Sequence, residues 1–387
     1  MRAADNQKHI VPPMRVLITG AAGFLGSHTA EAFARRGDEV IPLVRATSRT
    51  DFLESLQLKP RPVALHDRTG LAQALRGVEV VVHTAAKVEN FGRWEEFAEI
   101  TVAGTRHVLQ AAIAAGVRQF IHISSRGVYE RPRQPGEPYD EATPYGQPYQ
   151  WSYYARAKIE AEQIVRDARQ WGRISTTIFR PTWVYGPRDV NIFARLVEAL
   201  RAGRLKFIGD GPNRMNLVYV TDAVRAIELA AANSRAHDQI YNLAADELSP
   251  TQREFVERLG ALLDLPLPAS RNSYAAAHRL GFLSECAAHA TGYRVCPPVS
   301  RLSVLLLGGN RHFVNRKLRE ELGWQPLVGY EDGLRRTVNW YLGRGRPPSP
   351  LTVLPRAPET VPSTPRTGES LPAGPPIPDR AARPAAK

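Results

Sequence analysis

The segment 19–26, with Gly20, Gly23 and Gly26 three residues apart, limits the possible folds of this chain more strongly than any other. It follows the apolar run 16–18 and precedes the amphipathic segment 27–36, so the sequence predicts a strand, a glycine turn and a helix. Glycine lets a backbone approach an anion closely, and the start of a helix offers unpaired N–H groups. The pattern therefore predicts a dinucleotide-binding turn, and a tight turn without a ligand is the alternative.

A tyrosine and a lysine four residues apart, Tyr154 and Lys158, lie in the predicted helix 154–168. Residues at this spacing lie on one helix face, and a neighbouring cation favours the phenolate. The pair therefore predicts a lowered pKa for Tyr154, which could then exchange a proton with a substrate oxygen. The strand-like run 120–123 ends at Ser124 and Ser125, whose hydroxyls could bind the same oxygen. A surface helix pair is the alternative, but the order of these segments favours an enzyme.

The periodicity of the chain predicts an α/β fold. The 387 residues are 43% apolar, enough for a large core. Strand-like runs at 16–18, 40–44, 80–83, 120–123 and 176–179 alternate with helical segments such as 98–115. This alternation is typical of a Rossmann fold, a doubly wound parallel sheet. Later segments, at 193–202, 255–263 and 274–311, predict a smaller C-terminal substrate lobe.

We divide the chain into four parts on this basis. Residues 1–13 are predicted to be a disordered N-terminal extension, and 14–187 an NAD(P)-binding Rossmann domain that carries the catalytic residues. Residues 188–343 would form the substrate lobe, interleaved with the last elements of the Rossmann sheet. The proline-rich tail 344–387 is predicted to be disordered, because its composition cannot bury enough apolar surface.

Composition argues against several other classes of protein. The net charge is +13, but the arginines are scattered rather than clustered, so we expect no nucleic-acid partner. No apolar run is long enough for a signal peptide or a transmembrane helix, and we expect a cytoplasmic protein. The run 302–307 could contact a membrane surface, but a buried helix is favoured. Cys286 and Cys296 are too few for a disulfide framework or a zinc site and should be reduced thiols.

Together these motifs make residues 14–342 resemble the extended short-chain dehydrogenase/reductases, the NAD-dependent epimerase/dehydratase superfamily. The resemblance also includes the H-x-A-A motif that begins at His83 and the R-P-x-x-x-Y-G-P motif that begins at Arg180. It implies that Ser125, Tyr154 and Lys158 are catalytic; Ser125 is chosen over Ser124 because it stands four residues before Tyr129. It further implies a homodimer, and a cofactor site formed by Gly20, Gly23, Phe24, Leu25, Gly26, Arg45, Asp67, Ala85, Ala86, Lys158 and Pro181.

The end of the second predicted strand bears on the choice of cofactor. An Asp or Glu there would accept hydrogen bonds from the ribose of NAD, but this chain has Arg45. A guanidinium suits a 2′-phosphate, and Arg49 could add a second charge. NADP is therefore favoured over NAD, which stays open because Arg45 could also stack on adenine.

Two departures from the sugar-nucleotide branches indicate the reaction. Arg126 and Gly127 replace the Asp-Glu pair of dehydratases, and Trp183 replaces the Asn that commonly contacts a substrate diphosphate. The chain is instead similar to the branch of 3β-hydroxysteroid dehydrogenases, dihydroflavonol reductases and oxo-lipid reductases. We expect an oxidoreductase that interconverts a secondary alcohol and a ketone on an apolar, steroid-like, oxo-lipid or flavonoid-like substrate. A sugar-nucleotide epimerase or reductase and an inactive cofactor-binding scaffold are the alternatives.

Three further expectations concern the surroundings of the site. Aromatic residues near the nicotinamide could line an apolar pocket, or simply pack helices: Phe91, Trp94, Tyr149, Trp151 and Tyr153. Arg126 could bind a substrate carboxylate, as in a β-oxo acid or a sterol acid, although a solvated surface arginine is favoured. Thr101 stands where the family commonly has an Asn that supports the active site.

Overall fold

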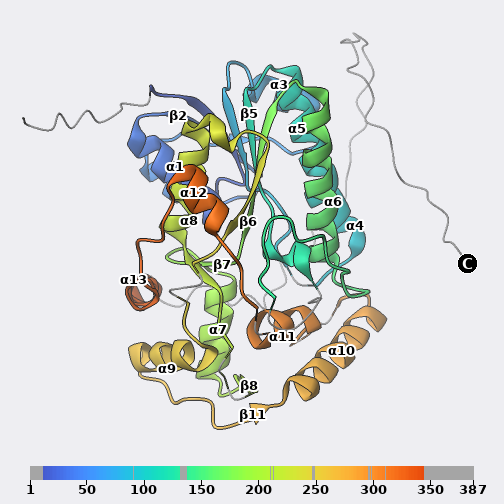
Figure 1. The fold of residues 1–387 in the computed structure, drawn as a ribbon, viewed down its shortest axis with the longest axis vertical. Coiled ribbons are helices and arrows are strands. Elements are labelled where there is room, and N and C mark those ends of the chain that lie inside the picture. Colours follow the sequence, from blue (N-terminus) through green and yellow to red (C-terminus); the bar gives the residue numbers. More distant parts are fainter. Residues whose placement is uncertain are drawn as a thin grey trace, which may run out of the picture. The chain divides into compact units, whose positions relative to one another are not determined.

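The protein is described by a computed structural model that covers residues 12–89, 91–130, 137–209, 211, 213–245, 249–294, 297, 299–309 and 311–343. Its centre is a seven-stranded sheet in the order β10-β6-β5-β4-β1-β2-β3, in which all neighbouring strands are parallel (Figure 1). The strands are β1 (Arg15–Thr19), β2 (Glu39–Val44), β3 (Arg61–Pro62), β4 (Val80–His83), β5 (Gln119–Ile123), β6 (Ser175–Pro181) and β10 (Gln239–Leu243). This arrangement confirms the predicted doubly wound parallel sheet.

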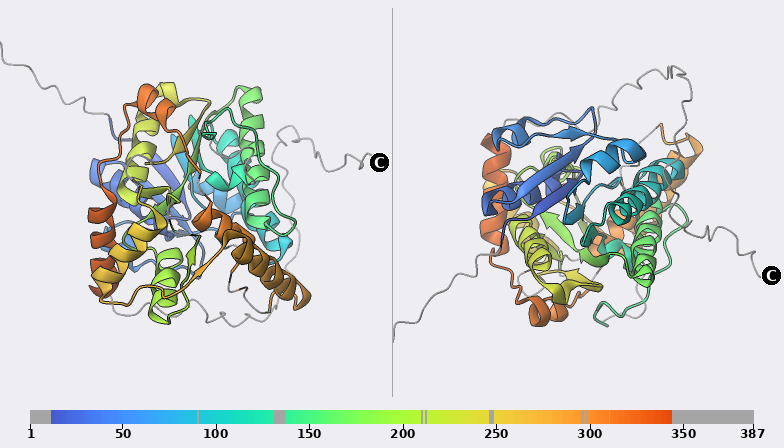
Figure 2. Two further views of the ribbon diagram at one scale, coloured as in Figure 1. Left: turned by 60° about the horizontal axis from the view of Figure 1, so that its bottom comes forward. Right: turned by 90° about the horizontal axis from the view of Figure 1, so that it is seen from above.

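Helices cover both faces of the sheet (Figures 1 and 2). One face carries α1 (Phe24–Arg36), α8 (Val220–Ala232) and α12 (Arg316–Leu322), with the short α2 (Asp51–Ser55) beside α1. The other face carries α3 (Arg68–Ala74), α5 (Gly104–Ala114) and α6 (Tyr153–Ala168), with α4 (Trp94–Phe97) next to them. Short 3₁₀ turns at Arg126–Tyr129, Arg169–Trp171 and Ser234–Ala236 complete the connections.

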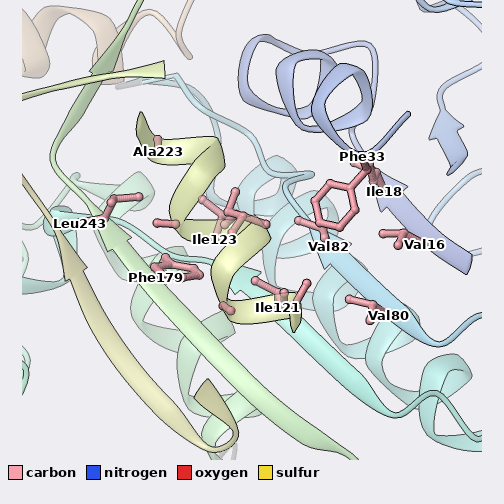
Figure 3. Packing of buried hydrophobic residues seen from close by; sticks show 14 of the residues in the cluster. Val16, Ile18, Phe33, Val80, Val82, Ile121, Ile123, Phe179, Ala223 and Leu243 are labelled. Atoms are coloured by element: carbon pink, nitrogen blue, oxygen red, sulfur yellow. The ribbon is translucent and has the colours of Figure 1, made fainter. Parts of the chain in front are cut away.

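The core has two layers, because successive strand residues point to opposite faces of the sheet. Val16, Ile18, Val80 and Val82 pack toward α1 and α8, as Figure 3 shows. The opposite layer, which packs under α5 and α6, contains Leu17, Ile41, Val81, Phe120 and Ile178. Burial on both faces explains why these strands read as continuous apolar runs in the sequence.

The remaining elements form a second lobe beyond the carboxyl ends of the strands, in the part of the chain predicted to be the substrate lobe. Its helices are α7 (Ile192–Arg201), α9 (Gln252–Leu263), α10 (Tyr274–Ala290), α11 (Arg301–Gly308) and α13 (Tyr330–Gly343). Two small parallel sheets pair β7 (Trp183–Tyr185) with β9 (Leu217–Tyr219), and β8 (Phe207–Ile208) with β11 (Arg271–Asn272). A capping box between Thr251 and Glu254 fixes the start of α9. Helix α10 packs on α11 and extends along the edge of the lobe (Figures 1 and 2).

Most predicted elements are present with small changes in their ends. All five predicted strands occur, and the predicted helix 154–168 is α6. The predicted helical segment 98–115 is present, but its first part, Ala98–Ala103, is a π-helix that leads into α5. The expected disorder of the segments 1–13 and 344–387 falls almost entirely outside the described residues.

The described residues also bear on the membrane and cysteine expectations. Among the helices of the described part, none is long and apolar enough to cross a membrane. The run 302–307 forms most of α11, in which Leu302, Val304 and Leu305 are buried, so the favoured buried helix is confirmed. Cys286 is a free, partly buried thiol, and Cys296 lies outside the described residues.

Candidate active site

The predicted site residues follow the carboxyl ends of five strands that are neighbours in the sheet. The glycine turn follows β1, Arg45 follows β2, and Ala85 lies two residues beyond β4. Ser125 follows β5, and Pro181 is the buried last residue of β6. Because the chain leaves β1 toward β2 on one side while β4 pairs on the other, the turn lies at the switch point where open α/β sheets bind ligands.

The glycine turn has the geometry that close approach of a phosphate requires. The Gly23 N–H donates to the Gly20 carbonyl oxygen at 2.8 Å, and Gly20 has a φ of +65°. A Cβ on Gly26 would collide with that same oxygen. Helix α1 begins at Phe24, and among the described residues no side chain caps its N-terminus. Its first N–H groups therefore remain for an anion, so this turn fits the pyrophosphate of a dinucleotide.

The two residues predicted to bind the adenosine half have different surroundings. Arg45 is exposed just beyond β2, and its N–H donates to the Ser48 hydroxyl oxygen at 3.2 Å. Asp67 accepts a hydrogen bond from the Gly70 N–H at 2.9 Å and is the N-cap of α3. Asp67 thus has a structural role that was not predicted, although an aspartate three residues before a helical glycine is an N-cap signal.

Hydrogen bonds of the Thr19, His83 and Thr105 side chains hold the loop after β4. The Ala85 N–H donates to the Thr19 hydroxyl oxygen at 3.3 Å, and His83 bridges Thr19 (2.8 Å) and Thr105 (3.0 Å). Burial, and to a smaller extent the charge of Lys158, lower the pKa of His83 to about 3, so His83 is neutral here.

Thr101 supports this loop from the π-helix. Its hydroxyl accepts a hydrogen bond from the Lys87 N–H at 3.0 Å, directly after Ala85 and Ala86. Thr101 is buried, and its carbonyl oxygen accepts a bond from the Thr105 hydroxyl at 2.6 Å. The threonine therefore holds the backbone next to the predicted cofactor residues through its side chain.

Ser125 and Tyr154 come together beside Gly127. The Ser125 oxygen accepts a hydrogen bond from the Gly127 N–H at 3.0 Å, and the Ser125 hydroxyl acts on the Tyr154 phenol, whose pKa it lowers against the effect of burial. A Cβ on Gly127 would lie 3.3 Å from the Ser125 oxygen and 3.4 Å from the Tyr154 ring, so both side chains approach one point. The two predicted catalytic hydroxyls thus form one unit.

The expected lowering of the Tyr154 pKa toward neutrality does not occur in this structure. Burial raises the pKa of Tyr154, and the Ser125 hydroxyl and the charge of Arg126 oppose that rise. The cation that acts on the phenol is therefore Arg126 rather than Lys158. The prediction from four-residue spacing failed because the removal of the phenol from water outweighs the neighbouring charges.

Lys158 is held one turn away from Tyr154. Its Nζ donates to the Ile123 carbonyl oxygen at 2.7 Å, at the end of β5. Burial lowers the pKa of Lys158 to about 8, against the attraction of the Glu162 carboxylate. The amine is consequently fixed at the carboxyl edge of the sheet.

A buried ion pair beneath the site accepts a hydrogen bond from Ser124, and this distinguishes Ser124 from Ser125. The Arg180 guanidinium binds the Glu162 carboxylate at 2.6 Å, and both side chains are almost fully buried. The Ser124 hydroxyl donates to Glu162 Oε2 at 2.5 Å, while Tyr129 receives a hydrogen bond from Arg180 at 2.5 Å. Ser124 is thus committed to this network, which supports the choice of Ser125.

The predicted aromatic pocket divides into two groups. Trp94 packs on Tyr153 with ring centres 5.8 Å apart, which is the helix packing that was the alternative. Tyr149 and Trp151 instead face the lobe: Trp151 stacks on Phe282 of α10 at 6.0 Å, and Tyr149 contacts His278 at 5.4 Å.

Two residues used to argue the reaction class are both buried. Arg126 is only 6% exposed and lies 6.0 Å from the centre of the Phe313 ring, so the favoured solvated arginine is wrong. The reason is that Ser125 caps a 3₁₀ turn that carries Arg126 inward under the lobe. Trp183 packs against Phe255 at 5.7 Å, where a diphosphate-binding Asn would stand.

Two buried ionisable residues in the lobe were not predicted from the sequence. Glu130 follows the Ser125 turn, and Arg311 lies between α11 and α12. Burial raises the pKa of Glu130 to about 7 and lowers the pKa of Arg311. No local motif marks either residue, because their burial arises from segments distant in the sequence.

Comparison with known proteins decides the family. The family model described as "NAD dependent epimerase/dehydratase family" matches residues 16–244. The chain belongs to this family. The match contains the glycine turn, Ser125, Tyr154, Lys158 and Arg180, which are the residues that carried the resemblance.

Members of the NAD dependent epimerase/dehydratase family align with most of the chain. A 2-alkyl-3-oxoalkanoate reductase of Stenotrophomonas maltophilia is 30% identical over 328 residues, 84% of this chain and 98% of the relative. The human sterol-4-alpha-carboxylate 3-dehydrogenase, decarboxylating, is 27% identical over 84% of this chain and 87% of the relative. The dTDP-glucose 4,6-dehydratase DesIV of Streptomyces venezuelae, solved with NAD bound, superimposes with a TM-score of 0.68 at 28% identity, covering 85% and 97% of the two chains.

These matches confirm two predictions. The chain is an extended short-chain dehydrogenase/reductase, and it is an oxidoreductase that uses a nicotinamide dinucleotide. The predicted class of reaction, at an oxo or hydroxy carbon of an apolar substrate, agrees with the names of both sequence relatives.

Proposed function

We propose that this enzyme reduces a ketone on an apolar substrate to the secondary alcohol, with NADPH as the reductant. The observation that carries the proposal is the approach of Ser125 and Tyr154 to one point beside Gly127, together with the raised pKa of Tyr154. A neutral phenol at physiological pH is the proton donor that reduction needs. When bound, the reduced nicotinamide supplies a hydride to the carbonyl carbon.

The residues of the chain supply the remaining steps. The Ser125 hydroxyl holds the substrate oxygen, and Tyr154 transfers its phenolic proton to that oxygen as negative charge develops there. Lys158, fixed on the Ile123 carbonyl, holds the ribose of the cofactor. Arg126 stabilises the transient phenolate, because its charge already acts on Tyr154.

The preference for NADPH is proposed from Arg45. Its exposed guanidinium stands where a ribose-binding acid would favour NAD. We expect Arg45→Asp to lower kcat/KM for NADPH by roughly 10- to 100-fold and to raise it for NADH. Arg316→Asp, which makes the same change of charge at an exposed residue of α12 paired with Glu320, is the matched control. An unchanged NADPH to NADH ratio would contradict the role of Arg45.

The test of the proposed function is a spectrophotometric assay of nicotinamide oxidation. Purified enzyme is mixed with NADPH or NADH and with oxo-acyl esters, oxosteroids, flavonoid ketones or UDP- and dTDP-hexoses. Oxidation of NADPH by an apolar ketone, abolished in Tyr154→Phe, is the expected result. Turnover of none of the ketones would contradict the proposal.

A sugar-nucleotide reaction is the second candidate, because the superimposed dehydratase acts on dTDP-glucose. Its products are examined by chromatography, since an epimerase gives no net oxidation. Buried Trp183 favours the apolar ketone. We also propose a homodimer, on the family resemblance, and light scattering of the purified chain tests it.

A further inference from the structure

Arg311 is a buried arginine whose hydrogen-bonding capacity is not met by the residues that the structure describes. It is 7% exposed, and neither its Nε nor its Nη2 reaches a hydrogen-bond acceptor among the described residues. Burial lowers its pKa, as expected when a cation is removed from water. A buried guanidinium normally has an acidic partner, because burying an unpaired charge is costly.

Two other buried arginines, Arg301 and Arg180, do have such partners. Arg301 binds Glu285 twice, through its N–H (2.7 Å) and its Nε (2.6 Å), and so joins α11 to α10. Arg180 is paired with Glu162 beneath the sheet edge. Arg311 differs from Arg301 and Arg180 because no carboxylate of the described residues accepts a hydrogen bond from its Nε or Nη2.

A stack of two aromatic rings connects Arg311 with the reaction centre. The Arg311 guanidinium lies 5.7 Å from the centre of the Tyr139 ring. Tyr139 stacks on Phe313 at 5.1 Å, and the guanidinium of Arg126 lies 6.0 Å from Phe313. Arg126 directly follows Ser125, so this series of contacts connects Arg311 with the segment that carries one of the proposed catalytic hydroxyls.

The one buried carboxyl that acts on Arg311 does not pair with it. Glu130 attracts Arg311 electrostatically, but its Oε1 accepts the Tyr149 N–H at 3.3 Å, and its Oε2 has no partner among the described residues. Burial raises the pKa of Glu130 to about 7, so a large fraction is neutral at physiological pH. The positive charge of Arg311 is then left for an incoming anion.

We propose that Arg311 binds the carboxylate of an apolar oxo acid, which makes it the residue that selects acidic ketones. This inference rests on the proposed ketone reduction. A guanidinium offers two parallel N–H donors that match a carboxylate, and a buried pair is stronger than an exposed one. The rings of Tyr139 and Phe313 supply an apolar wall for the rest of the substrate. Because Nε and Nη2 are enclosed in this structure, the side chains around them must separate when the acid enters.

The first test compares an oxo acid with its own methyl ester. Freshly saponified 3-oxododecanoate and methyl 3-oxododecanoate are assayed with NADPH on the parent enzyme, on Arg311→Met and on Arg279→Met. Arg279 is an exposed arginine of α10 and provides the same change of charge away from the site. We expect Arg311→Met to lower kcat/KM for the acid by roughly 10- to 100-fold and to leave the ester within about twofold.

The outcomes separate the two proposals. Turnover of neither compound by the parent enzyme contradicts the ketone reduction itself. Equal losses for acid and ester in Arg311→Met, or no loss for either, overturn the role of Arg311 while leaving the reduction intact. Arg311→Lys keeps the charge but not the two parallel N–H donors, so this variant should retain part of the preference for the acid. It replaces Arg311→Met in the assay if Arg311→Met is poorly folded.

A second readout does not depend on turnover. If Arg311 is kept for binding, its unpaired charge destabilises the fold without substrate, so Arg311→Met should have an equal or higher melting temperature than the parent. Dodecanoate, which has the carboxylate but no ketone, should raise the melting temperature of the parent and not that of Arg311→Met. A lower melting temperature for Arg311→Met with no effect of dodecanoate on the parent would assign Arg311 a structural role only.

Discussion

Tyr154 is a neutral phenol in this structure, because burial raises its pKa more than Ser125 and Arg126 lower it. A proton donor needs its protonated form, whereas a proton acceptor needs the phenolate. The rate of ketone reduction should therefore change little between about pH 6 and 8, while alcohol oxidation should rise with pH. Rate profiles in both directions, with saturating cofactor, check this prediction.

Replacement of the phenol tests the same residue directly. Tyr154→Phe should lower kcat by roughly 10²- to 10⁴-fold, since a positioned acid contributes that much, and should leave the dissociation constant of NADPH nearly unchanged. Tyr153→Phe is the control, because Tyr153 packs on Trp94 and Phe97 instead. Activity retained in Tyr154→Phe would mean that Tyr154 is not the proton donor.

Glu130 makes the binding of acidic substrates depend on pH. The groups that act on it are Arg311, Glu285, the Tyr149 N–H and Ser152, and its pKa of about 7 is set mainly by burial. Above pH 7 Glu130 ionises, competes for Arg311 and repels a carboxylate. The KM of an oxo acid should thus rise as pH increases through about 7, while that of its ester stays level, and Glu130→Gln should remove the rise. A parallel rise for acid and ester would contradict this role of Glu130.

The strands and helices were predictable where a local pattern repeats. Runs such as 80–83 are buried on both faces of the sheet, and their length fits a strand rather than a helix. Strand β3 is only Arg61–Pro62, exposed and without an apolar pattern, so nothing local marks it. The π-helix Ala98–Ala103 also escaped prediction, because its composition is that of an α-helix and Thr101 bonds to the distant Lys87 backbone.

The glycine turn gives a prediction about how β1, α1 and the cofactor fit together. A Cβ on Gly26 would collide with the Gly20 carbonyl oxygen, so Gly26→Ala must move the start of α1. We expect the dissociation constant of NADPH to rise at least about tenfold, because the N–H groups of the first turn lose their alignment. Gly343→Ala at the end of α13, where nothing lies within 4 Å, should leave it unchanged. Fluorescence titration of NADPH measures both, and equal affinities would mean that the turn does not hold the cofactor.

The site as a whole could be predicted only in part. Ser125, Tyr154 and Lys158 belong to motifs with fixed spacing, so the sequence alone indicates them. Glu130 and Arg311 lie far apart in the chain, and their charges meet only because the lobe folds onto the sheet edge. The wrong expectation for the Tyr154 pKa has the same origin, since burial depends on the complete fold and outweighs the nearest charge.

Burial of Lys158 links this site to the stability of the fold. Its pKa falls from 10.5 to about 8, so the unfolded chain binds more protons than the folded one between those values. Stability then rises with pH across that window, and the full penalty for the buried ammonium is present below about pH 8. Lys158→Met removes the penalty, although it also leaves the Ile123 carbonyl without its donor.

The variant should accordingly be inactive yet more stable than the parent at pH 7, by about 1–3 kcal/mol. Urea unfolding at several pH values measures the difference, which should shrink as pH rises from about 8 toward 10.5 because the parent loses the charge. Arg156→Met, an exposed change on the same helix, is the control and should show no such dependence. A Lys158→Met variant that is less stable than the parent at pH 7 would contradict this prediction. It would mean that the hydrogen bond of the ammonium to Ile123 and its attraction to Glu162 outweigh the loss of hydration. The charge of Lys158 would then stabilise the fold.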